Sequence, residues 1–163
     1  MTFVSDQPDL LEIEAVNPPT GIPEPEHVHP KQDSGARVTA GALVFEVDGV
    51  ERRVRTGESI EIPASTPHRF WNDGDEDAHA VQWFRPALNT RSFFETLFAL
   101  AQTDELDERG MPSLLQIAVM IPEFADAIRP TRPPWPVQKA AAALLGPVAR
   151  RRGYNAIRTG SAS

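Results

Sequence analysis

Alternating hydrophobic and polar positions dominate the chain between Arg37 and Phe84. Short runs rich in valine, isoleucine and aromatic residues alternate there with turn residues, and this pattern predicts β-strands. The Asp48-Gly49 pair favours a hairpin with a type I′ turn, because both residues tolerate positive φ. Closely spaced strands of this kind predict an antiparallel barrel or sandwich. The expected strands are 10–16, 37–39, 42–47, 50–55, 59–62, 68–71 and 78–84.

The hydrophobic period changes after Arg85-Pro86, where apolar residues begin to recur at helical spacing. Ser92-Phe-Phe-Glu95 has the form of a capping box and predicts the start of a first helix. A second helix is expected from Pro112, interrupted or kinked at Pro122 and resuming to Ile128. A third is expected around 137–152, which ends in basic residues.

The change of period divides the chain into three expected parts. We expect a β-barrel in 1–86, a helical extension in 87–155 that packs on the barrel or on a dimer partner, and a flexible tail in 156–163. The 163 residues suit a compact body with its own core. The predicted fold class is therefore mainly β, followed by an α-helical extension.

Charged residues are unevenly distributed along the chain. All 23 acidic residues precede position 129, whereas seven of the 16 basic residues lie at or after it. Such a basic segment could bind nucleic acid or acidic lipid, but the interleaved aromatic residues of a single-strand binder are missing. We therefore expect it to dock on acidic surface of its own chain or of a second copy, which favours a homodimer without a nucleic-acid partner.

Membrane and export signals are also missing from the sequence. No apolar run approaches the roughly 18 residues of a membrane span, and the N-terminus lacks the pattern of a signal peptide. The sequence contains no cysteine, so disulfides and thiolate ligands are excluded. We expect a cytoplasmic protein with no membrane partner.

Three histidines have the placement of metal ligands. His27 and His29 lie two residues apart, so on a strand their side chains project from one face. His68 on a neighbouring strand can complete a cluster of ring nitrogens about 2.1 Å from a shared ion. We interpret the cluster as a site for a divalent transition metal. The alternative is a vestigial cluster in a protein that binds its ligand without metal.

The residues around these histidines resemble the two sequence motifs of the cupin superfamily. The matching positions are Gly21, His27, His29 and Gly41 in the first motif, and Gly57, Pro63, His68 and Asn72 in the second. The resemblance covers about residues 10–86. It implies a double-stranded β-helix barrel whose open mouth holds a metal bound by the three histidines and a glutamate.

Two positions depart from the cupin pattern. Ser34 stands where the ligand glutamate is expected, and Ser65 replaces a glycine. Asp33 would point to the opposite face of a regular strand, so it can act as a ligand only if the loop before it is irregular. Gln32 is the other candidate. Without a carboxylate, a divalent ion would keep its full charge and favour an anionic, chelating substrate.

The resemblance implies a reaction class. The cupins with three histidine ligands include thiol dioxygenases and β-diketone-cleaving dioxygenases, and both use ferrous iron. The predicted function is therefore a dioxygenase acting on a small chelating molecule. Imidazole ligands suit Fe²⁺, Ni²⁺, Cu²⁺ and Zn²⁺, and Mn²⁺ is a further candidate, so the residues do not select the metal. A metal-dependent isomerase or cyclase and a non-catalytic ligand-binding protein are the alternatives.

Four residues are candidates for the substrate pocket: Ser34, Asp33, Phe70 and Gln82. Phe70 shares strand parity with His68, so it points into the barrel mouth or packs in the core. Ser34 is either an uncharged pocket residue or part of a solvated turn. Gln82 contacts the pocket if the face that carries Ala80 is inward, and His79 then lies outside.

Overall fold

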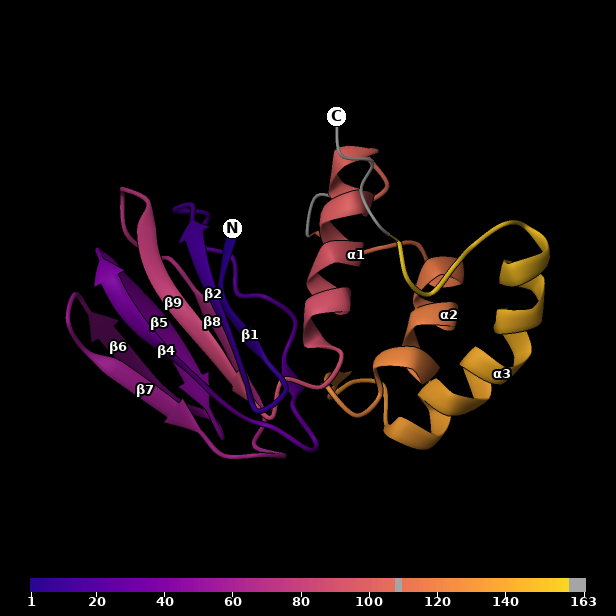
Figure 1. Ribbon diagram of the computed structural model, residues 1–163, viewed down its shortest axis with the longest axis horizontal. Helices are drawn as coiled ribbons and strands as arrows, with labels where there is room; N and C mark the ends of the chain where they lie inside the picture. The colour runs from indigo at the N-terminus through magenta and orange to yellow at the C-terminus, as the bar shows by residue number, and fades with distance from the viewer. Residues whose placement is uncertain (108–109, 159–163) are drawn as a thin grey trace. The chain divides into compact units, whose positions relative to one another are not determined.

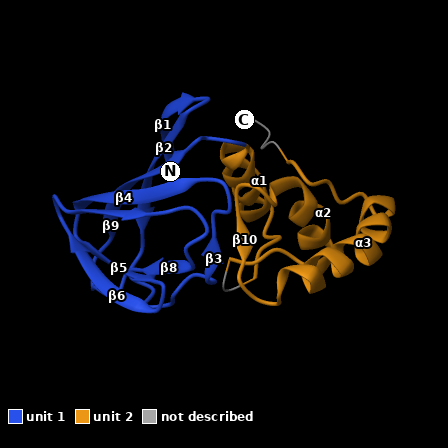
Figure 2. Ribbon diagram, turned by 90° about the horizontal axis from the view of Figure 1, so that it is seen from below, with its two compact units in different colours: residues 1–88 blue, residues 89–163 orange. Residues whose placement is uncertain are grey.

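The computed structural model describes residues 1–107 and 110–158. The chain divides into two compact units, Met1–Leu88 and a second unit that begins at Asn89 (Figure 2). Each unit has its own hydrophobic core.

Two antiparallel sheets form the first unit (Figure 1). One sheet has the strand order β1-β2-β9-β4-β7, and the other contains β3-β8-β5-β6 of this unit. This architecture confirms the predicted mainly-β, double-stranded β-helix fold. The strands are β1 Thr2–Gln7, β2 Leu10–Asn17, β3 His27–Val28, β4 Asp33–Ala40, β5 Ala42–Val47, β6 Val50–Arg55, β7 Ser59–Ile62, β8 His68–Trp71 and β9 Ala78–Arg85.

The core of this unit lies between the two sheets, where every second side chain of a strand points inward. Apolar inward residues are almost fully withdrawn from water, which is the main stabilising contribution to such a fold. The core residues are Ala36, Val38, Leu43, Phe45, Val54, Ile60, Ile62, Ala78 and Ala80.

The hairpin between β5 and β6 has the predicted turn. Asp48 has φ of 50° and Gly49 has φ of 76°. Positive φ at both central residues is the signature of a type I′ turn, whose twist matches that of the flanking strands. The turn sets the register in which Val47 faces Val50.

Three parts of the sheets differ from the expectation. β1 was not predicted, the strand expected to carry both His27 and His29 ends at Val28, and β4 begins at Asp33 rather than Arg37. β1 is an edge strand with a mostly exposed surface, and β3 contains only two residues after a proline-rich segment. β1 has too few alternating apolar residues to be recognised locally, and β3 is too short for its end to be predicted from a pattern.

Helices form the second unit, apart from the short strand β10 Arg129–Pro130. The helices are α1 Thr90–Gln102, α2 Leu114–Phe124 and α3 Trp135–Arg151. Leu100, Met120 and Phe124 form the core of this unit. None of the helices in the described residues is long and apolar enough to span a membrane.

The predicted helix boundaries need two corrections. The capping box at Ser92 was wrong, because α1 begins at Thr90 and Asn89 is its N-cap residue. The helix expected to resume to Ile128 was also wrong, because α2 continues through Pro122 and ends at Phe124. Ser113 caps α2 instead, since its hydroxyl accepts a hydrogen bond from the Gln116 backbone N–H.

The tail predicted at 156–163 is described only as far as residue 158. Arg158 donates its backbone N–H to the Thr96 hydroxyl at 3.1 Å, and its guanidinium pairs with Glu105. These contacts anchor the described part of the tail to its own unit. Residues 159–163 lie outside the described residues.

Replacement of Gly35 by alanine should strongly destabilise the first unit. A Cβ at this position would lie 2.3 Å from the Ile60 carbonyl oxygen and 2.5 Å from the Trp83 ring. We expect a loss of at least about 3 kcal/mol in unfolding free energy by urea titration, because backbone and a packed ring must both move. Gly57→Ala is the control, since it has positive φ but open space around its Cβ. It should lose only about 1 to 2 kcal/mol, and equal losses in the two variants would contradict this account of Gly35.

Candidate metal centre

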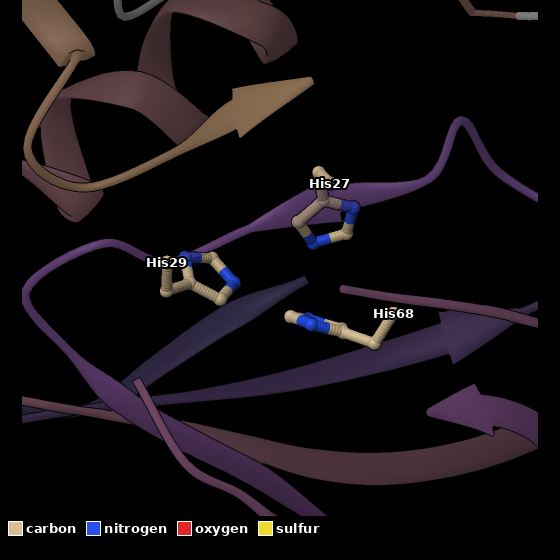
Figure 3. Close-up of side chains that lie close together, drawn as sticks. All are labelled: His27, His29 and His68. Carbon is tan, nitrogen blue, oxygen red and sulfur yellow. The ribbon is translucent and has the colours of Figure 1, made fainter. Parts of the chain in front are cut away.

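The pairing of β3 with β8 brings the three histidines together. His27 lies directly opposite His68 in this antiparallel pair, and His29 follows two residues after His27. The ring centroids are 5.1 Å apart for His27 and His29, 4.4 Å for His27 and His68, and 5.2 Å for His29 and His68. The three imidazoles therefore converge on one small volume (Figure 3).

Backbone hydrogen bonds hold the segments that carry these histidines. The Glu24 N–H donates to the Phe70 carbonyl oxygen at 3.2 Å, which ties the proline-rich lead-in to β8. The Ser65 N–H donates to the His29 carbonyl oxygen at 2.9 Å. Ser65 has φ of 64°, in the left-handed region that favours glycine, and it stands where the cupin motif has a glycine.

Backbone carbonyls also set the tautomers of two imidazoles. Nδ1 of His27 lies 3.0 Å from the Pro25 carbonyl oxygen, and Nδ1 of His68 lies 2.8 Å from that of Thr66. A carbonyl oxygen can only accept, so each Nδ1 carries the hydrogen and each Nε2 keeps a free lone pair. Histidines that bind a metal typically have such a carbonyl acceptor on the ring nitrogen that does not face the ion.

The surroundings keep these imidazoles neutral. Burial lowers the pKa of His27 well below its usual 6.5, and the neighbouring His68 and His29 lower it further. Burial also lowers the pKa of His68, although its bond to Thr66 opposes the shift. A neutral imidazole is the form that can donate a lone pair to a metal ion.

The histidine cluster fits a divalent transition metal. One ring nitrogen from each histidine can be chosen so that all three lie within 4.8 Å of one another. His29 and His68 are only 4 % and 5 % exposed, so their rings are withdrawn from water. Within the described residues the cluster contains no carboxylate, so the ligand set is neutral.

Neither candidate for the missing glutamate joins the cluster. Asp33 is exposed, and its carboxylate accepts a hydrogen bond from the Ala64 backbone N–H at 2.9 Å. The Gln32 amide nitrogen donates to the carbonyl oxygens of Pro86 and Ala87. Both side chains stabilise loops, and the place of Asp33 in the substrate pocket stays a prediction.

The other pocket candidates lie on the inner faces of the barrel. Ser34 shares strand parity with the core residue Ala36, and Gln82 shares parity with Ala80. Gln82 is nevertheless only partly buried. Phe70 packs against the core and stacks on Phe45 at 5.3 Å. Their contacts with a substrate stay predictions.

Glu24 is a neighbour of the site that sequence reasoning missed. Its Oε1 lies 3.7 Å from Nδ1 of His27 and has no hydrogen-bond partner among the described residues. Burial raises the pKa of this carboxyl to about 8, although a hydrogen bond from the Phe70 backbone lowers it in part. The only local signal was its position three residues before a histidine, whereas its burial depends on the distant strand β8.

The sequence of the first unit matches a known family. Residues 14–84 match the family model described as the cupin domain. A polyketide synthase named CurC from Streptomyces cyaneus is 36% identical over 61 residues, which are 37% of this chain and 40% of that protein. An oxidoreductase from Arthrobotrys oligospora is 30% identical over 125 residues, which are 71% of this chain and 47% of that protein. The chain spans less than half the length of the curated relatives it matches.

The fold also matches a solved structure. KdgF from Halomonas sp. superposes with a TM-score of 0.50 and 24% sequence identity, over 55% of this chain and 82% of that chain. At this identity the likeness shows a shared fold, which agrees with the two-sheet barrel described above.

His68→Ala should abolish metal retention while the barrel stays folded. The change removes one of three ligands, and a neutral two-histidine set binds divalent ions far more weakly. Elemental analysis of untagged protein loaded with Zn²⁺ and passed through a desalting column measures the effect. His79→Ala is the matched control, because His79 lies outside the cluster. Equal metal content in the His68 and His79 variants would contradict the assignment of His68 as a metal ligand.

Glu24→Gln should stabilise the metal-free protein at alkaline pH and not at acidic pH. The folded state holds the Glu24 proton up to a pKa of about 8, whereas an unfolded carboxyl loses it near the ordinary value of 4.5. Wild-type stability therefore falls as pH rises from 4.5 to 8, and the glutamine variant lacks this loss. Urea unfolding at pH 5 and pH 8 tests the prediction, with Glu61→Gln as an exposed control. A stability difference that does not grow with pH would contradict the burial of Glu24.

Proposed function

We propose that this protein, a member of the cupin superfamily through its domain at residues 14–84, is a three-histidine metal-dependent oxygenase that acts on a small chelating substrate. The observation that carries the proposal is the convergence of three imidazoles. Those of His27 and His68 have lowered pKa values and Nε2 lone pairs freed by backbone acceptors. Fold alone would not support an activity. The three imidazole donors support the proposal, because imidazole nitrogens are suitable ligands for a divalent transition metal.

The neutral ligand set determines what kind of substrate the site favours. A divalent ion supplies Lewis acidity and, if it is iron, redox chemistry with oxygen. His27, His29 and His68 would hold such an ion without compensating its charge. An anionic substrate that chelates through two atoms would supply the missing charge. Enolates of 1,3-dicarbonyl compounds, thiolates and catecholates have this property.

The relatives support the same chemistry. The Arthrobotrys oligospora relative is named an oxidoreductase, and its similarity extends over 71% of this chain. The Streptomyces cyaneus relative is named a polyketide synthase. Polyketides carry ketone groups on alternate carbons, so they contain the 1,3-dicarbonyl units that chelate a metal as enolates. The first name favours redox chemistry for this chain, and the second favours a substrate that carries ketone groups.

The barrel residues would bind and orient such a substrate. Phe70, Gln82 and Ser34 are on inner faces of the sheets, so they are the proposed lining of the pocket. Gln82 would donate or accept a hydrogen bond, and Phe70 would pack on the apolar part of the substrate. His29 contacts the Phe84 ring at 5.1 Å, which adds an apolar wall beside the metal ligands.

A metal-dependent cyclase or isomerase is the second candidate function, favoured by the polyketide synthase relative. It would use the same Lewis acidity without oxygen. The two activities are separated by whether oxygen is consumed along with the substrate. A purely ligand-binding protein would consume neither. A homodimer and a cytoplasmic location stay predictions from the sequence.

Oxygen uptake tests the proposed activity directly. The full chain is purified without chelators, loaded with Fe²⁺ under anaerobic conditions and mixed with pentane-2,4-dione, a small thiol or a catechol in aerated buffer. We expect one substrate class to be consumed with stoichiometric oxygen uptake, because the chelate and oxygen need the same ion. Loaded His68→Ala should show no uptake. Substrate loss without oxygen uptake would establish the cyclase or isomerase instead, and stabilisation without turnover would establish a binding protein.

A further inference from the structure

Ser34 places a hydroxyl inside the barrel without satisfying it. The residue is 3 % exposed, and its Oγ has no hydrogen-bond partner among the described residues. The next inward residues of β4, Ala36 and Val38, are apolar core residues. A buried hydroxyl without a partner destabilises a protein, and native structures rarely keep one without a reason.

The position of this hydroxyl is next to the histidine cluster. Ser34 of β4 pairs directly with Phe84 of β9 and with Ile62 of β7, and both neighbours are buried. Cross-strand neighbours on one face have Cβ atoms about 5 Å apart. The Phe84 ring in turn contacts His29 at 5.1 Å. Ser34 therefore belongs to the wall of the other sheet, one side chain away from the metal ligands.

The chemistry of this wall is uncharged. Ser34 contributes an O–H donor, and Phe84 and Ile62 on its two sides are apolar. A hydroxyl donates a strong hydrogen bond to an anionic oxygen, and a weaker one to sulfur. Among the anionic chelates that a three-histidine site would accept, an oxygen ligand gains more from this contact than a thiolate does.

We propose that the Ser34 hydroxyl is a specificity-determining group that donates a hydrogen bond to an anionic oxygen of the substrate at the metal centre. The inference rests on the proposed function and narrows its substrate class to oxygen chelates, such as the enolates of 1,3-dicarbonyl compounds. The hydroxyl is then left without a partner in the protein because its partner is the substrate.

Ser34→Ala separates this role from a structural one. If the Ser34 hydroxyl stabilises the fold, its removal should lower the thermal stability of the protein. If the hydroxyl instead binds a ligand, Ser34→Ala should be as stable as wild type or more stable, because the variant no longer buries an unpaired hydroxyl. Thermal unfolding of the metal-free proteins measures this difference. Ser59→Ala, at an exposed position of β7, is the matched control.

Ligand binding is measured on the Zn²⁺-loaded chain, because zinc allows binding without redox turnover. We expect Ser34→Ala to weaken binding of pentane-2,4-dione by about tenfold or more, which corresponds to a hydrogen bond to a charged acceptor. Binding of a small thiol should change by less than about threefold, since sulfur is a weak acceptor. Zinc affinity should be unchanged. Ser34→Cys, a weaker donor of similar size, should lie between wild type and alanine for the dione.

Two results would overturn the inference in distinguishable ways. If wild type retains zinc but binds pentane-2,4-dione no better than Ser34→Ala does, Ser34 is not a ligand contact and the metal centre stands. If wild type retains no zinc, the proposed function fails, and the inference fails with it. Equal weakening of dione and thiol binding would also contradict a role in specificity.

Discussion

Three imidazoles around one small volume, two of them almost fully buried, are the constraint on which the rest of the site depends. Neutral histidines in this arrangement present lone pairs to one another, and any protonation would add a charge beside other buried rings. In His27 and His68 the carbonyl oxygens of Pro25 and Thr66 fix the tautomer, because each accepts a hydrogen bond from Nδ1 and so keeps the hydrogen there. Burial lowers the pKa of both residues, and for His27 the neighbouring His68 and His29 lower it further. A divalent ion would satisfy the free lone pairs that the fold has concentrated.

The two sheets of the barrel contribute different groups to the site. The sheet that contains β3 and β8 carries two of the imidazoles, and the loop after β3 adds the third. The inner face of the opposite sheet carries Ser34, Gln82 and Phe84, none of which is charged. Neutral ligands on one side and an uncharged wall on the other leave the charge of an ion to be balanced by what binds to it. This is the physical basis for expecting an anionic substrate.

The sequence predicted those features that depend on local pattern. The strands between Ala42 and Phe84 were found because apolar residues alternate and glycine turns separate them. The histidines were found because their motif spacing is specific. The capping box predicted at Ser92 was wrong, because a four-residue signal does not decide where packing begins a helix. The strand predicted at the first two histidines is observed, but it ends at Val28, because only His27 pairs with β8.

Contacts between residues far apart in the sequence could not be predicted from local patterns. Glu24 looks like one of several acidic residues in a proline-rich lead-in, and only the return of β8 beside it makes it a partly buried neighbour of His27. Ser34 could be assigned a strand face from parity, but the missing partner of its hydroxyl is visible only once the opposing strands are placed. Similarly, the hydrogen bond that the Asp33 carboxylate accepts from the Ala64 backbone N–H depends on a turn about thirty residues away.

X-ray absorption at the metal edge of the Zn²⁺-loaded full chain tests the central claim most directly. The account predicts one tightly bound ion per chain, with three imidazole nitrogens at about 2.1 Å and the remaining positions filled by water or added ligand. Loss of the imidazole signal in His68→Ala would accompany loss of the ion. A loaded protein whose ion is surrounded by oxygen atoms alone, or one that retains no ion after removal of free metal, would contradict the account.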